Sequence, residues 1–160
     1  MTNAISQEAA QLMALSWLYR QSEAHIRTAV EAWGPKIGFQ DIPIRVTEMS
    51  SRWGSCVAAK RLSFCWRQVM APPQVIDYLA VHEITHMKHQ NHSSAYWQAV
   101  AQAYPDWKRW DDWLGKNGSI LMNLYPKISL ACLRQIKHMP AVPVSDLGGF
   151  RLVFGSEDEL

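Results

Sequence analysis

Residues 74–92 read QVIDYLAVHEITHMKHQNH, and this stretch decides the fold of the 160-residue chain. Pro72 and Pro73 come just before it, and proline is tolerated in the first turn of a helix. We therefore predict a helix from Gln74 to His89. Its apolar residues surround the helix axis instead of forming one stripe, which is typical of a buried central helix. Polar residues on such a helix need a chemical reason.

The polar residues of this helix include an H-E-x-x-H sequence, His82 to His86. Residues four apart on a helix lie about 40° apart around the axis and about 6 Å apart along it, so both histidines can converge on one metal ion. Glu83 is turned about 100° from His82, so it can reach a metal-bound water without ligating the ion. Burying these groups without partners is costly, which favours a metal site over ordinary core residues.

A catalytic zinc ion takes three protein ligands, so a third ligand must lie outside the motif. His89 lies too far along the helix to share the ion, and we interpret it as a surface or supporting residue. His92 is the expected third ligand, because Asn91 can adopt the left-handed conformation that ends helices and let the chain fold back. A carboxylate at Asp111 or Asp112 is the alternative.

Secondary structure before the central helix is predicted from periodicity. Apolar spacings of three and four predict an amphipathic helix over residues 6–33, stopped by Gly34-Pro35. Alternating patterns predict strands near 42–46, 52–57 and 62–67. We interpret these strands as a small antiparallel sheet packed on the central helix, and the fold class as α+β.

After the central helix, residues typical of helix starts and ends are clear at first and become less clear toward the C-terminus. A helix should begin after Ser93 or Ser94 and run to Pro105, and a short piece should follow from 106 to 114. Gly115–Gly118 is interpreted as a boundary. We therefore predict a domain over 1–118 and a C-terminal extension over 119–160 that is largely irregular and peripheral to the metal site.

Composition excludes several classes of protein. Apolar residues make up 48% of the chain and charged residues 19%, which argues against disorder. The net charge of +2 predicts neither a nucleic-acid nor a membrane partner, and the uncharged stretches are too short to span a bilayer. Three cysteines without metal-finger spacing favour a reducing compartment, so we expect a cytoplasmic protein.

Several short motifs occur in a characteristic order. They are RWGSC at 52–56, LSFCWR at 62–67, APP at 71–73, VIDY at 75–78, the H-E-x-x-H sequence, NHS at 91–93 and Trp97. Together they resemble the YgjP-like family of predicted zinc metallopeptidases, which is related to the SprT-like proteases. The resemblance covers about residues 12–115. It implies a zincin-like core and one zinc ion held by His82, His86 and His92, with Glu83 as the catalytic base.

The segment from Met49 to Ile76 has a second interpretation. It contains basic residues and no acidic one, with aromatic residues between them: Arg52, Lys60, Arg61 and Arg67 with Trp53, Phe64 and Trp66. Such a pattern can contact nucleic acid, but a hairpin with solvated charges and buried aromatics is favoured, because alternation already explains it. Arg52 and Tyr96 are the candidate substrate-binding residues.

The sequence thus favours a zinc metallopeptidase that hydrolyses peptide bonds with a zinc-activated water and Glu83 as general base. Its partner would be a protein or peptide substrate. Two alternatives stay open: a zinc-stabilised module that associates with nucleic acid, and a metal hydrolase acting on a non-peptide amide.

Overall fold

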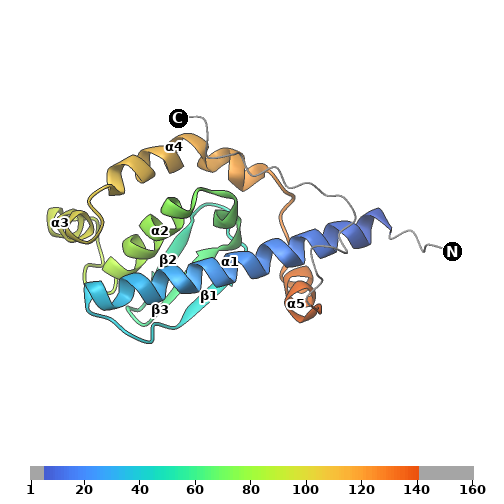
Figure 1. Cartoon of the computed structure of the whole chain (residues 1–160), viewed down its shortest axis with the longest axis horizontal. Helices are drawn as coiled ribbons and strands as arrows, with labels where there is room; N and C mark the ends of the chain where they lie inside the picture. The colour runs from blue at the N-terminus through green and yellow to red at the C-terminus, as the bar shows by residue number, and fades with distance from the viewer. Residues whose placement is uncertain (1–5, 141–160) are drawn as a thin grey trace.

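The structure is a computed structural model that describes residues 6–140. Within these residues, five α-helices and a three-stranded sheet form an α+β fold (Figure 1). The elements in chain order are α1 (Gln7–Ile37), β1 (Ile44–Thr47), β2 (Gly54–Val57), β3 (Arg61–Cys65), the short 3-10 helix η1 (Trp66–Met70), α2 (Pro73–Thr85), α3 (Ser94–Ala103), α4 (Trp107–Asn123) and α5 (Leu130–His138).

Helix α2 is the central helix of the fold. It packs against α1, α3, α4 and β2, and Figure 1 shows it between the long helix α1 and the arching helix α4. Its buried side chains lie all round its axis: Val75, Ile76, Tyr78, Leu79, Ala80, Val81 and Ile84. The prediction of a buried central helix is confirmed.

The end of α2 differs from the prediction. The helix ends at Thr85 instead of reaching His89. The amide of Lys88 donates to the carbonyl oxygen of Thr85, three residues earlier, so the chain enters a tight turn. A new helix begins after Ser93, whose side chain accepts from the amide of Tyr96, which confirms the predicted N-cap. The early end of α2 leaves enough chain to reverse direction before α3.

The sheet has the strand order β1-β3-β2 and is mixed. Strands β2 and β3 form the predicted antiparallel hairpin, in which Cys56 pairs with Leu62. Strand β1 pairs with β3 in parallel, with Ile44 opposite Leu62, so the prediction of an antiparallel sheet is wrong for this pair. Alternation identifies a strand and its buried face, but not the direction of its neighbour. That direction depends on the connection from β1 to β2, which leaves β3 between them.

The predicted end of α1 at Gly34-Pro35 is also wrong, because the helix continues to Ile37. Pro35 lacks the amide proton that would bond to the carbonyl oxygen of Glu31, yet the helix continues for two more residues. The helix ends at Gly38, which adopts a φ of 98° and donates its amide to the carbonyl oxygens of Gly34 and Pro35. Glycine is the usual residue for this left-handed capping position.

Helix α4 passes through the predicted boundary at Gly115–Gly118 and ends at Asn123. Gly118 serves packing: a Cβ atom there would lie 3.2 Å from Nε1 of Trp53. The expectation of irregular structure is therefore wrong for residues 119–123 and for α5. Ile128, Leu133 and Ile136 are buried in the same core cluster as α1 and the sheet. The rest of the predicted extension, residues 141–160, lies outside the described residues.

No helix among residues 6–140 combines the length and the apolar character needed to cross a membrane.

Candidate metal centre

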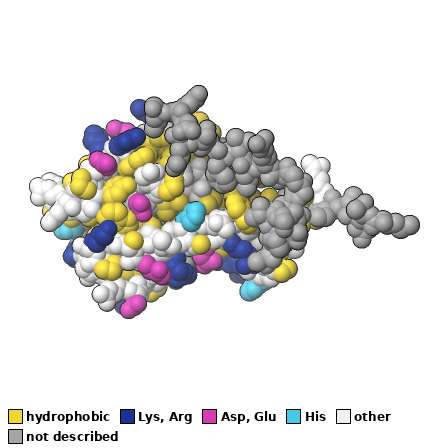
Figure 2. All heavy atoms as spheres, viewed as in Figure 1, with side chains coloured by type: hydrophobic (Ala, Val, Ile, Leu, Met, Phe, Trp, Pro, Cys, Tyr) yellow, Lys and Arg dark blue, Asp and Glu magenta, His cyan; other side chains and the backbone are white. Residues whose placement is uncertain are grey.

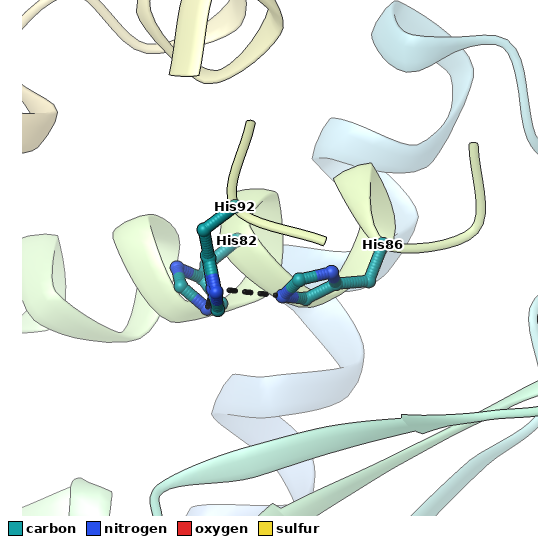
Figure 3. A group of neighbouring side chains, drawn as sticks. All are labelled: His82, His86 and His92. Atoms are coloured by element: carbon teal, nitrogen blue, oxygen red, sulfur yellow. Dashed lines mark hydrogen bonds between the residues drawn. The ribbon is translucent and has the colours of Figure 1, made fainter. Parts of the chain in front are cut away.

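Three histidine side chains converge where α2 ends (Figure 3). His82 lies in the last turn of α2, and His86 is the residue that caps it. The turn after α2 brings His92 back over them. Nε2 of His92 is 3.1 Å from Nε2 of His86 and 3.2 Å from Nε2 of His82. One nitrogen atom from each ring thus lies within 4.8 Å of the other two.

This spacing fits a tetrahedral ion. Zinc binds imidazole nitrogen at about 2.0–2.1 Å, which sets two ligand nitrogens about 3.3 Å apart in a tetrahedral site. The two measured separations, 3.1 and 3.2 Å, are close to that value. The residues therefore fit a zinc ion in the number and type of ligands, and two of the three nitrogen separations match a tetrahedral site.

A hydrogen bond orients the ring of His86 so that its Nε2 atom faces the other two histidines. Its Nδ1 atom is 2.9 Å from the carbonyl oxygen of His89. A carbonyl oxygen only accepts, so Nδ1 carries the ring proton and Nε2 presents its lone pair to the cluster. His89 thus contributes its main chain and not its imidazole, in agreement with its predicted supporting place.

The charge state of the cluster suits a metal. Burial, together with neighbouring His86 and His92, lowers the pKa of His82 to about 3. Burial also lowers the pKa of His86. Both rings are therefore neutral at pH 7, which is the form that binds metal ions.

Glu83 lies beside the cluster on the buried side of α2, with 4% of its surface exposed. Burial raises the pKa of its carboxyl group to about 8, and the charge of Arg52 opposes this rise. Glu83 is tightly enclosed by β2: a Cβ atom added at Gly54 would lie 2.5 Å from Oε1 of Glu83. Sequence analysis did not predict this contact. The RWGSC motif was the available signal.

Aromatic rings support the histidines. Tyr96 stacks on His86 with ring centroids 4.6 Å apart, and its hydroxyl donates to the carbonyl oxygen of His82. Trp97 stacks on His92, and Trp107 stacks on Trp97. Tyr96 is fully buried and does not line the cleft described below. Its predicted substrate-binding role stays a prediction that this position does not favour.

The carboxylates considered as alternative ligands are engaged by other side chains. Oδ1 of Asp111 accepts a hydrogen bond from the hydroxyl of Tyr78 at 2.7 Å. Asp112 is exposed and pairs with Lys108 at 3.7 Å. Neither belongs to the group of donor atoms that His82, His86 and His92 form.

A cleft of about 540 Å³ opens beside the cluster. Strand β2 forms one wall, the end of α2 with Glu83 forms the floor, and α4 contributes Asp111 and Leu114. Arg52 is exposed at its edge. Strand β2 is an edge strand of the described sheet, so its outer edge has no strand partner there.

Several residues of the segment interpreted as a nucleic-acid-binding hairpin are buried and cannot contact a nucleic acid. Phe64, Trp66 and Arg67 are fully buried, and Arg67 forms an ion pair with Glu48 at 3.1 Å. On the face drawn in Figure 2, basic and acidic side chains are interspersed over the described surface.

Comparison with known families agrees with this geometry. The model of the YgjP-like metallopeptidase domain matches residues 1–117, which is most of the chain. The chain belongs to the YgjP-like family. The match includes α1, the sheet, α2, α3 and the first part of α4, so it contains every histidine of the cluster. Membership in this metallopeptidase family implies a metal. Neither a curated protein nor a solved structure matches this YgjP-like chain.

Proposed function

We propose that the chain is a zinc-dependent peptidase that binds one ion through Nε2 of His82, His86 and His92. The observation that carries this proposal is the convergence of the three imidazoles, in which Nε2 of His92 lies 3.1 Å from Nε2 of His86 and 3.2 Å from Nε2 of His82. The YgjP-like membership supports the same class of enzyme. We further propose that α2 and the sheet edge act as a zincin-like pair, with the ion between them.

Glu83 is the proposed general base. When bound, zinc polarises the scissile carbonyl and lowers the pKa of a coordinated water. Glu83 accepts the proton of the attacking water and passes it to the leaving amine. Its burial supports this role, because a carboxylate whose pKa is raised is a stronger base than an exposed one, and the positive charge of a bound ion would favour its ionised form. Gly54 provides the room in which this carboxylate lies.

The proposed substrate is a protein or peptide in an extended conformation. The outer edge of β2 borders the cleft, and a substrate strand can pair with such an edge through main-chain hydrogen bonds. Arg52 at the rim can bind a carboxyl group of the substrate. The main chain of an unfolded protein can adopt this extended conformation more readily than that of a folded domain, so unfolded proteins are the expected substrates.

Zinc content tests the ligand set. Purified wild-type protein should contain one zinc per chain, and His82→Ala, His86→Ala and His92→Ala should each lose most of it. His89→Ala is the matched control, because its main-chain carbonyl still accepts from His86. Zinc lost from the His89 variant and kept in the His92 variant would contradict the proposal.

Hydrolysis of an unfolded protein tests the reaction. Glu83→Gln should keep zinc and the fold, and should lower the rate by about 10²–10⁴-fold. Cleavage at the wild-type rate by this variant removes Glu83 from the mechanism. Zinc-loaded protein that leaves peptides intact but hydrolyses a small amide would favour the non-peptide alternative.

DNA binding at low salt tests the nucleic-acid alternative. Binding through phosphate contacts should weaken steeply as salt is added. We expect no salt-dependent binding through this segment, because Arg67 and two of its aromatic neighbours are buried.

A further inference from the structure

The ring of His82 is held from the side opposite the histidine cluster. Its Nδ1 atom is 3.3 Å from the hydroxyl oxygen of Tyr78, one turn earlier on α2. The Tyr78 hydroxyl in turn donates to Oδ1 of Asp111 on α4 at 2.7 Å. A hydrogen-bonded chain thus runs from α4 through Tyr78 to His82.

The number of protons shared by Asp111, Tyr78 and His82 determines which ring nitrogen of His82 carries its proton. A tyrosine hydroxyl has one proton, and here the Asp111 carboxylate accepts it. The Tyr78 oxygen can then only accept, so Nδ1 of His82 must be the donor. Nε2 of His82 is left with its lone pair, and it lies 3.2 Å from Nε2 of His92.

We propose that Tyr78 and Asp111 are positioning residues that hold His82 in the tautomer able to bind the metal. The inference rests on the proposed function, since it assigns what supports one ligand of that site. Tyr78 is 1% exposed, so water does not compete for its hydroxyl. Asp111 lies in the wall of the cleft. Through it, α4 contributes to metal affinity without supplying a ligand.

Zinc affinity of the full chain, measured by competition with a chromophoric chelator, tests the proposal. Tyr78→Phe removes the acceptor of the Nδ1 proton and should weaken zinc binding about 10-fold, within the 10–100-fold range typical of groups behind a ligand. Asp111→Asn keeps an acceptor oxygen and should weaken binding less. Asp111→Ala should weaken it most, because the freed Tyr78 proton is then donated to Nδ1 and the ring proton moves to Nε2.

The double variant separates this proposal from a merely structural role. Without the Tyr78 hydroxyl, nothing drives the ring proton to Nε2, so Tyr78→Phe/Asp111→Ala should bind zinc more tightly than Asp111→Ala alone. If the two residues only support the fold, the second substitution should weaken zinc binding further. Equal or weaker binding by the double variant would overturn the proposal, as would wild-type affinity in both single variants.

Matched controls come from neighbouring residues. Tyr104→Phe removes a tyrosine hydroxyl that donates to the carbonyl oxygen of Gln74 and touches no histidine. Asp112→Ala removes the adjacent carboxylate on α4. Both should bind zinc like wild type. Should loss of the buried Tyr78 hydroxyl unfold the chain, comparison of Asp111→Ala with Asp111→Asn carries the same test.

Nitrogen-15 NMR of the imidazoles gives a readout independent of metal and activity. In the zinc-free full chain, His82 should carry its proton on Nδ1, and in Asp111→Ala on Nε2. If the tautomer follows this pattern while the wild type binds no zinc, the proposed function fails and the positioning role stands. An unchanged tautomer in Asp111→Ala overturns the positioning role.

Discussion

Gly54 lies so close to Glu83 that a Cβ atom at residue 54 would be 2.5 Å from Oε1 and 2.8 Å from Cδ. Gly54, the first residue of β2, is thus packed directly against the carboxylate of Glu83, the proposed base. Any side chain at residue 54 must move the carboxylate, the strand or both.

Gly54→Ala should therefore lower hydrolysis while leaving zinc binding intact, because the histidines do not contact residue 54. A displacement of about 1 Å can cost about 100-fold in rate, and we expect a loss in kcat/KM of at least 10-fold. Steady-state kinetics and zinc content measure the two effects. Gly115→Ala is the control, since its Cβ meets nothing within 4 Å. Full activity of Gly54→Ala would show that Glu83 does not need its present position.

Zinc should stabilise the folded chain. The histidine rings converge only in the folded protein, so the ion binds the native state more tightly than the unfolded one. At a zinc concentration about 1,000 times Kd, the gain is about 4 kcal/mol, visible as a rise in Tm. His92→Ala should remove the rise without harming the metal-free fold, because His92 is exposed. A chelator should reverse the effect in wild type.

The Glu48–Arg67 pair should make stability depend on pH. Burial raises the pKa of Glu48, but hydrogen bonds from Arg67, the Ile128 amide and Trp66 outweigh this and lower the pKa below its usual value. A carboxyl group with a lowered folded-state pKa contributes stability above its unfolded-state value of about 4.5, and this contribution is lost as pH falls through the folded-state pKa.

Glu48→Ala would leave the fully buried Arg67 charge without its carboxylate, which should cost about 3–5 kcal/mol at pH 7. Denaturant unfolding should show the difference from wild type shrinking below pH 4.5. Glu23→Ala is the control: its pair with Arg27 is exposed, so its loss should cost under about 1 kcal/mol. A difference that stays constant down to pH 2 would contradict the argument.

Helix α5 should stabilise the domain although the family match ends at residue 117. Ile136 has no exposed surface and lies in the main core cluster. Ile136→Ala should lower the free energy of unfolding by about 2–5 kcal/mol, as is typical of buried isoleucine. Ile120→Ala, at a 61% exposed position, should change it little. Equal effects of the two substitutions would mean that α5 does not belong to the core. Whether residues 1–118 form a separate domain stays a prediction.

The local elements of this protein were determined by the sequence itself. Periodicity predicts α2 as a buried helix, because apolar residues surround its axis, and Ser93 predicts the start of α3, because its side chain caps the amide of Tyr96. The H-E-x-x-H spacing brings His82 and His86 to one face by helix geometry alone, and the turn around Asn91 makes His92 the expected partner.

Tertiary structure decided what depends on contacts between distant segments. The parallel pairing of β1 with β3 follows from the path of the chain, which alternation does not encode. In the sequence, Gly118 is typical of a boundary between elements. In the structure it packs against Trp53, and α4 continues through it. The contacts of Gly54 with Glu83, and of Asp111 with Tyr78, join residues about 30 apart in sequence, and no local pattern determines which of them meet.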